Sequence, residues 1–337
     1  PSYSGPIVVG DRVFTTQTKD RKFEVVTAHD RETGKRLWEA QWEGAMSVPF
    51  FAKANGDWIR STPAYDDGRL YVGGMRDVLV CLDVETGDVV WKVDFVKSLK
   101  SKLPAFGFVC SPLVQGDHVY VQAAGSLVKL DKRSGEVVWQ SLKDGGGMFG
   151  SAFSSPVLGQ VAGREQLLVQ TRSTLAGVDP SSGKELWSEK IKAFRGMNIL
   201  TPTVHNDGVF TSSYGGRSLF FNIAEEDGKL TANESWDNKT QGYMSSPAII
   251  DGHAYLHLRN QRFTCINLET GEIAWTTKPY GKYWSMAASG DKLLALDERG
   301  ELLLIQADPN EFKLLGTCNV GDNTWAHLAV SGNEVFI

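Results

Sequence analysis

Histidine and carboxylate side chains, which bind metals and transfer protons, are scattered through this 337-residue chain without the spacing that such chemistry needs. His253 and His257 are four residues apart, but they stand in an alternating strand pattern that separates them too far for easy chelation. The acidic stretches at 66–68 and 225–228 lack the ligand spacing of a calcium loop and indicate turns. The chain contains no nucleophile elbow and no Walker loop, and the glycines at 145–147 indicate a connection rather than a phosphate cradle.

Cysteine usage and charge exclude further classes of protein. The four cysteines form no adjacent or Cys-x-x-Cys pair, so we expect small buried thiols rather than a disulfide framework: Cys81, Cys110, Cys265 and Cys318. The net charge of −5, without a basic block, argues against nucleic acid or an anionic membrane as the main partner. No apolar run approaches the length of a transmembrane helix.

One motif recurs along the chain: Asp or Asn, two residues, Thr or Ser, Gly, three residues and Trp. Self-similarity at a period of a few tens of residues indicates a propeller, solenoid or array. The five copies are Asp30, Gly34 and Trp38; Asp83, Gly87 and Trp91; Asp131, Gly135 and Trp139; Asp179, Gly183 and Trp187; and Asn267, Gly271 and Trp275.

Each motif position has a physical reason. Apolar alternation precedes and follows the motif, which predicts two short strands joined by a turn. The Asp or Asn oxygen can accept from backbone N–H groups two or three residues on, and Gly takes the positive-φ position that a branched residue resists. The Trp lies on the second strand, where we expect its large ring to be buried between neighbouring sheets.

A second signature, a hydroxyl residue followed by Pro and an apolar pair, starts each repeat. A strand tolerates proline at its first residue because proline lacks the N–H of a central ladder. Repeats starting near 6, 63, 112, 156, 202, 247, 286 and 327 leave room for about four strands each, which is the blade size of a β-propeller. The repeats near 286 and 327 lack the proline, and the fifth repeat replaces the motif turn by 225–228 but keeps Trp236.

The predicted fold is therefore all-β: an eight-bladed β-propeller of four-stranded antiparallel blades forming a single domain over residues 1–337, with seven blades as the alternative. The last repeat stops at Ile337 after two strands, and an open ring would expose sheet edges. We therefore expect the native chain to extend past Ile337 and before Pro1. The long first repeat carries a loop with exposed aromatic residues: Phe50, Phe51 and Trp58.

These repeats resemble the PQQ-type, quinoprotein-like β-propeller repeat over essentially the whole chain. One group with this repeat comprises quinoprotein alcohol dehydrogenases, which hold pyrroloquinoline quinone (PQQ) and calcium and stack a disulfide between adjacent cysteines on the quinone. The other is the BamB-like, non-enzymatic branch, typified by periplasmic outer-membrane assembly lipoproteins. This chain has no adjacent cysteines and is much shorter than those enzymes. The resemblance implies a scaffold without a cofactor, since the motif residues are structural.

The residues just before each blade start are the candidate binding surface, because these connections should surround one mouth of a central channel. Aromatic and Met side chains, which are favoured at protein-binding surfaces, are frequent there. The candidates are Arg60, Phe108, Phe153, Met197, Tyr243, Met244, Tyr283, Trp284 and Trp325, with Tyr3, Met148, Arg195 and Ile199 nearby. These rings could instead simply plug the channel. Arg60 and Arg195 could hold a carboxylate beside an apolar ring.

The expected function is a non-catalytic protein-binding or scaffolding role, with a protein or peptide partner and no nucleic acid. By resemblance alone, the expected location is periplasmic or otherwise extracytoplasmic. Two alternatives stay open at this point: a PQQ- and calcium-dependent oxidoreductase, and an extracytoplasmic sensor or ligand-binding domain of a longer protein.

Overall fold

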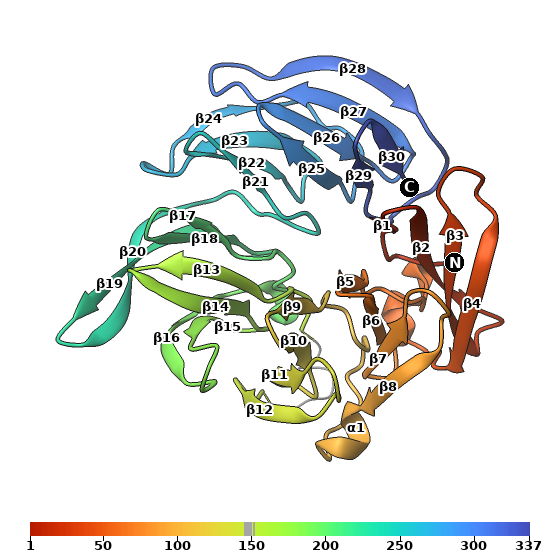
Figure 1. Ribbon diagram of the computed structural model, residues 1–337. Coiled ribbons are helices and arrows are strands. Elements are labelled where there is room, and N and C mark those ends of the chain that lie inside the picture. The colour runs from red at the N-terminus through yellow and green to blue at the C-terminus, as the bar shows by residue number, and fades with distance from the viewer. Residues whose placement is uncertain (145–149, 151) are drawn as a thin grey trace. The chain divides into compact units, whose positions relative to one another are not determined.

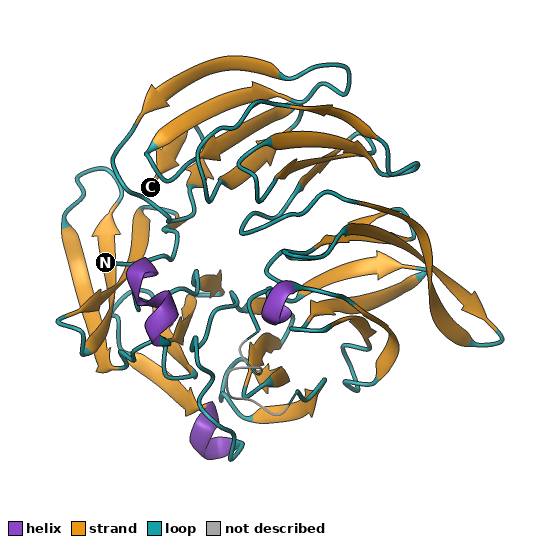
Figure 2. Cartoon of the chain, turned by 180° about the vertical axis from the view of Figure 1, so that it is seen from behind, coloured by secondary structure: helices purple, strands orange, loops and turns teal. Residues whose placement is uncertain are grey.

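The computed structural model is built almost entirely from antiparallel strands joined by short connections (Figures 1 and 2). It describes residues 1–144, 150 and 152–337; the glycine connection at 145–147 and Met148 lie outside the described residues. The helical segments found within these ranges are short and appear in purple in Figure 2: η1 (Phe50–Asn55), α1 (Phe95–Ser98) and η2 (Phe194–Gly196). None of the described helices is long and apolar enough to cross a membrane.

The chain divides into two compact units, and unit 1 comprises Pro1–Pro156 and Ala329–Ile337. Its described residues form three four-stranded blades and one two-stranded sheet. Blade 1 contains β1 (Ile7–Val9), β2 (Arg12–Lys19), β3 (Phe23–Asp30) and β4 (Arg36–Glu43). Blade 2 contains β5 (Ala64–Asp66), β6 (Arg69–Gly74), β7 (Val78–Asp83) and β8 (Val89–Asp94). Blade 3 contains β9 (Leu113–Gln115), β10 (His118–Ala123), β11 (Ser126–Asp131) and β12 (Val137–Ser141). Blade 8 contains β29 (Ala329–Ser331) and β30 (Glu334–Phe336).

Unit 2, Val157–Leu328, contributes four four-stranded blades among the described residues. Blade 4 contains β13 (Val157–Val161), β14 (Arg164–Gln170), β15 (Thr174–Val178) and β16 (Glu185–Lys190). Blade 5 contains β17 (Thr203–His205), β18 (Gly208–Ser212), β19 (Ser218–Glu226) and β20 (Lys229–Asn238). Blade 6 contains β21 (Ala248–Ile250), β22 (His253–His257), β23 (Phe263–Asn267) and β24 (Ile273–Thr276). Blade 7 contains β25 (Ser285–Ser289), β26 (Lys292–Leu296), β27 (Glu301–Gln306) and β28 (Lys313–Asn319).

The predicted fold class and blade size are confirmed: the described residues form seven full antiparallel blades and a partial eighth. Every blade begins within two residues of its predicted start. One detail differs, because each of the six blade-start prolines stands immediately before its first strand rather than inside it. Proline at that place costs no ladder hydrogen bond. The assignment of the whole chain to one domain stays a prediction.

The motif turn has the geometry that its residue types predict. The Asn267 Oδ1 atom accepts from the backbone N–H groups of Glu269 (2.9 Å) and Thr270 (3.0 Å), and the four Asp copies make equivalent bonds. The motif glycines have φ between 67° and 78°, where an L-residue with a side chain is strained. The side chain of the first motif residue therefore closes the turn between the third and fourth strands.

Four Trp residues reach the next blade of their own unit: Trp38, Trp91, Trp236 and Trp275. In the seven full blades of the described chain, a β-bulge shifts the register between the third and fourth strands. In each motif copy, the Trp is paired with the third-strand residue that immediately precedes this shift, as Trp38 is with Ala28. Trp38 Nε1 then donates to the Val84 carbonyl of blade 2 (2.9 Å), and its ring covers Gly87 so closely that a Cβ there would lie 2.6 Å from a ring atom. The same contact repeats for Trp91 on Gly135 and for Trp236 on Gly271.

Trp burial differs from the prediction in two ways. Five of the six rings remain partly exposed: Trp38, Trp91, Trp139, Trp236 and Trp275. Trp187 is buried (5% exposed), and its Nε1 donates to Gln166 of its own blade (2.7 Å). Blade 5 has no motif turn to receive the Trp187 ring, since β19 and β20 continue to a two-residue Asp227-Gly228 hairpin turn with both φ angles positive.

The core lies between adjacent blades. One cluster, for example, joins Tyr71 and Leu79 of blade 2 to Val119 and Val128 of blade 3. Three of the predicted buried thiols belong to such cores: Cys81, Cys110 and Cys265. The prediction is wrong for Cys318, which is exposed on β28, the outer strand of blade 7. No disulfide joins the four cysteines.

Buried carboxyl groups join the blades of unit 1. Glu24 is fully buried, and its carboxyl accepts from Met75 N of blade 2 (2.7 Å) and from Trp42 Nε1 (2.9 Å). Asp77 accepts from Ala124 N of blade 3 (2.8 Å). Burial raises the pKa of each group to about 7, against the hydrogen bonds that lower it. Blade contacts in unit 1 are thus sensitive to protonation near neutral pH.

We predict that Gly87→Ala destabilises the chain more than Gly34→Ala. Both glycines have positive φ, so both alanines carry the same strain, about 1–2 kcal/mol. Only the Gly87 methyl group meets an indole ring, that of Trp38, whereas nothing lies within 4 Å of the Gly34 site. Displacing that ring should add about 1–3 kcal/mol in urea titrations. Equal losses for the two variants would contradict the ring contact.

We also predict that Glu24→Gln reduces the pH dependence of stability. Its folded pKa of about 7 exceeds the unfolded value of 4.5, so the stabilisation from Glu24 is complete below pH 4.5 and lost as pH rises through 7. The change amounts to at most about 3 kcal/mol. Urea titrations between these pH values should show a flatter slope for the variant. Asp77→Asn removes the second buried carboxyl and should flatten the slope in the same way, and an unchanged slope in Glu24→Gln would contradict the assignment.

Candidate binding site

In the segments before the blade starts, side chains differ in burial from one residue to the next. Before blades 2 to 5, the side chain three residues before the proline is partly exposed and its neighbours on both sides are buried. Arg60 illustrates the pattern between the buried residues Ile59 and Ser61. This alternation decides which of the predicted residues can form a surface.

Phe108 and Trp284 are corrections to the predicted surface, because each is only 1% exposed. Phe108 stands four residues before Pro112 and stacks on Phe95 in the core (6.3 Å between ring centroids). Trp284 lies two residues before Met286, also on the inward side, and stacks on His257 (4.7 Å). Both residues stabilise blade packing rather than contact a partner.

Unit 1 holds two of the remaining candidates, Arg60 and Phe153. The Arg60 guanidinium lies 5.0 Å from the centroid of the Tyr3 ring, and Tyr3 packs on Trp58. Trp58 is half-buried by this contact, which corrects its predicted exposure. Phe153 belongs to a separate chain of rings that ends at Phe50, which is 85% exposed as predicted: Phe153, Phe106, Phe51 and Phe50.

Unit 2 brings together three predicted residues in a continuous row of rings, here called the aromatic row. Tyr243 lies 5.9 Å from Tyr283, and Tyr283 lies 4.0 Å from Trp325. Two further rings extend the row on the Tyr243 side: Tyr214 (5.0 Å from Tyr243) and Phe194 (5.3 Å from Tyr214). Met197 and Met244 are half-buried in the same connections. The prediction that all candidates in both units share one surface stays a prediction.

Sequence reasoning missed Tyr214 and Arg259, which lie in the turns between the second and third strands of blades 5 and 6. In an antiparallel meander, alternate turns lie at the same edge, so these turns accompany the segments before the blade starts. Counting turns along the chain could have found these residues. The Arg259 guanidinium lies 4.6 Å from the centroid of the Tyr214 ring, and Arg259 N donates to the Gln241 carbonyl (2.9 Å).

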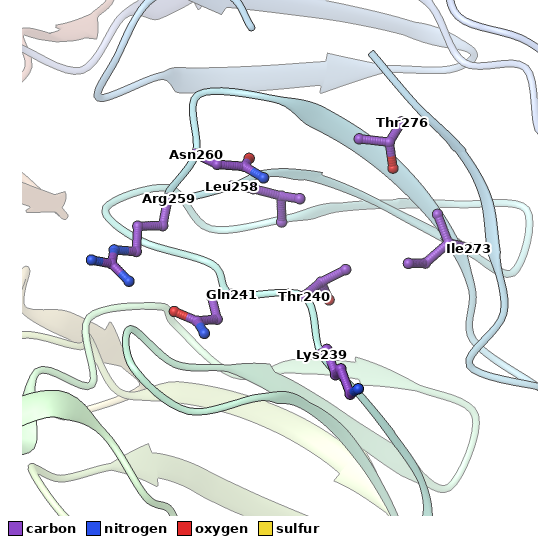
Figure 3. Close-up of a pocket in the computed structure, with 8 residues that line it drawn as sticks. All are labelled: Lys239, Thr240, Gln241, Leu258, Arg259, Asn260, Ile273 and Thr276. Atoms are coloured by element: carbon purple, nitrogen blue, oxygen red, sulfur yellow. The ribbon is translucent and has the colours of Figure 1, made fainter. Parts of the chain in front are cut away.

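Two pockets meet at Leu258 and Arg259, and together they are called the Arg259 groove (Figure 3). The larger pocket, of about 610 Å³, lies between the connection after β20 and blade 6, and its lining residues are Lys239, Thr240, Gln241, Leu258, Arg259, Asn260, Ile273 and Thr276. The smaller pocket, of about 170 Å³, reaches the aromatic row, and its lining adds Tyr214, Tyr243, His257, Gln261, Lys282 and Tyr283. In Figure 3 the side chains of Arg259 and Gln241 extend from facing segments.

Burial sets the charge state of the groove. It raises the pKa of Tyr243, which the hydroxyls of Tyr283 and Tyr214 raise further, so Tyr243 is a neutral hydrogen-bonding group at pH 7. Burial lowers the pKa of His257 to about 4, and its Nε2 atom lies 2.9 Å from the Gly281 carbonyl. The charges at neutral pH are therefore the basic ones of Lys239, Arg259 and Lys282. Among the described residues, no cluster of His, Cys, Asp and Glu could hold a metal ion.

Four-stranded blades, motif turns and Trp contacts between blades define a PQQ-type repeat protein of the β-propeller class. The family model for the outer membrane protein assembly factor BamB matches residues 22–277, and the chain belongs to this family.

Curated relatives and solved structures agree with this family. The outer membrane protein assembly factor BamB of Shewanella oneidensis is 24% identical over 265 residues, which cover 77% of this chain and 60% of that protein. The BamB of Yersinia pestis is 22% identical, over 73% of this chain and 63% of the relative. The chain thus spans less than two thirds of the length of these relatives. The crystal structure of BamB from Moraxella catarrhalis has a TM-score of 0.70 at 17% identity and covers 98% of this chain and 89% of its own. The computationally designed Ika8 protein has a TM-score of 0.66 at 12% identity, over 98% of this chain and 91% of the design.

We predict that the neighbours Trp284 and Tyr283 respond differently to replacement by alanine. Trp284→Ala should cost about 3–5 kcal/mol because it leaves a cavity in the core between blades 6 and 7. Tyr283→Ala should cost roughly 1 kcal/mol because its ring is partly exposed in the aromatic row. Urea titration measures both values, and the reverse order would contradict the assignment of Tyr283 to the surface.

Proposed function

We propose that this chain is a non-catalytic protein-binding scaffold that acts in the periplasm or another compartment outside the cytoplasm. The observation that carries the proposal is the aromatic row, in which rings from separate connections of unit 2 lie side by side. Aromatic side chains at a surface supply large contact area at low entropic cost, as binding hot spots require.

Family membership supports a proposal for the class of protein to which the partner belongs. Curated relatives carry the name outer membrane protein assembly factor, so we propose that the partner belongs to the assembly of outer-membrane proteins. The proposed role requires no cofactor. The structural elements of the motif, its turn and its Trp, already have partners within and between blades, and such partners explain these residues without catalysis.

The experiment is deletion of the gene from its host and measurement of outer-membrane β-barrel proteins by quantitative mass spectrometry. We expect their amounts to fall, and to recover with the intact gene. A gene carrying Tyr243→Ala and Tyr283→Ala should restore them less well than one carrying Tyr65→Ala, an exposed tyrosine of β5 outside the aromatic row. Unchanged amounts after deletion would contradict the proposed function.

A melting curve with PQQ and calcium tests the redox alternative in the same purified protein. Ligand at 100 times its dissociation constant would stabilise the fold by about 2.7 kcal/mol. We expect no shift of the midpoint, and a clear shift would favour the oxidoreductase.

A further inference from the structure

We propose that the Arg259 groove binds an extended acidic peptide segment, and this inference rests on the proposed scaffold function. The groove is in unit 2, where Leu258 and Arg259 line both the larger and the smaller pocket.

The charge of the lining favours an acidic occupant. No Asp or Glu is among the described residues that line either pocket, whereas Lys239, Arg259 and Lys282 are. Among the described residues, Arg259 makes no ion pair, and its guanidinium is exposed. A planar guanidinium held over a ring can bind a carboxylate through two parallel hydrogen bonds. The groove is therefore a basic site on a chain whose net charge is −5.

Acidic groups near the groove are already engaged. The Glu298 carboxylate accepts from the backbone N–H of Lys282, and buried Asp297 pairs with Arg299. On the other side, Asp237 pairs with Arg217. These contacts leave the basic side chains of the groove available to a ligand.

The shape and lining favour a peptide over a small anion. Beyond the basic groups, the lining offers amide side chains from Gln241 and Asn260, which can bond to a peptide backbone. Ile273, which is 47% exposed, and the rings of the aromatic row offer apolar contacts on both sides of Arg259. A small anion would use only the guanidinium, whereas an extended segment would use both pockets.

The groove is held in place before binding. Gly242 and Leu258 form an isolated antiparallel bridge, so the connection after β20 is paired with the Arg259 turn. The Gln241 side chain accepts from Gly215 N (3.1 Å), which joins the same connection to the turn of Tyr214. A preformed site loses less conformational entropy when it binds a ligand.

The test uses the intact chain and two short synthetic peptides of alternating acidic and aromatic or aliphatic residues. The second peptide has asparagine in place of every aspartate. We expect the acidic peptide to bind at least about tenfold more tightly in calorimetry, since bonds to charged groups are the stronger ones. Arg259→Ala should abolish that preference and Arg259→Lys should keep part of it. Lys184→Ala removes an equal charge from an exposed turn of unit 2 and should change nothing.

Three results would overturn the proposal. The two peptides could bind equally, or Arg259→Ala could bind the acidic peptide as Lys184→Ala does. Inorganic phosphate could also displace the acidic peptide more strongly than sodium chloride of the same ionic strength. The last result would identify a small-anion site. Failure of this inference is separable from failure of the scaffold function, because the gene-deletion experiment reports on partner assembly whether or not the groove is used.

Discussion

The packing of an indole ring onto a bare glycine of the next blade is the contact on which the repeated structure depends. Trp38, Trp91 and Trp236 each donate a hydrogen bond to a backbone carbonyl of the neighbouring turn, and their rings cover Gly87, Gly135 and Gly271. At these three positions glycine is required twice, once for its positive φ and once because a Cβ would meet the ring. The motif thus describes an interface between blades as well as a turn within one.

Some junctions between blades lack the contact between Trp and glycine or add other contacts to it. Blade 5 lacks the motif turn, and Trp187 of blade 4 turns to Gln166 within its own sheet and becomes buried. In unit 1, buried Glu24 and Asp77 add backbone contacts from one blade to the next. Blade 8 is joined to blade 1 by the pair of Arg31 and Glu334 (2.6 Å). Within a unit, apolar clusters between adjacent blades are thus supplemented by a few directed hydrogen bonds.

Binding surfaces in such a protein arise from connections rather than from strands. The repeated contacts hold the blades, so the segments between them can vary in residue type without loss of the fold. In unit 2 that variation places five rings in a row, beside a groove whose lining charges are basic. The proposed partner site therefore has a rigid base, which would limit the entropy lost on binding.

The sequence by itself determined the fold class, the blade size and the turn chemistry, because these depend on local spacing: Asp or Asn, Gly and Trp at fixed intervals. It also identified the connections that carry aromatic residues, including Tyr243, Tyr283 and Trp325. Only the tertiary structure decided which of these side chains point outward, since neighbouring residues of one connection can differ in burial: Tyr283 is partly exposed, whereas Trp284 and Phe108 are buried in the core. The Arg259 groove was equally beyond local spacing, because Tyr214, Gln241 and Arg259 are far apart in the chain and meet only when the turns of two blades lie side by side.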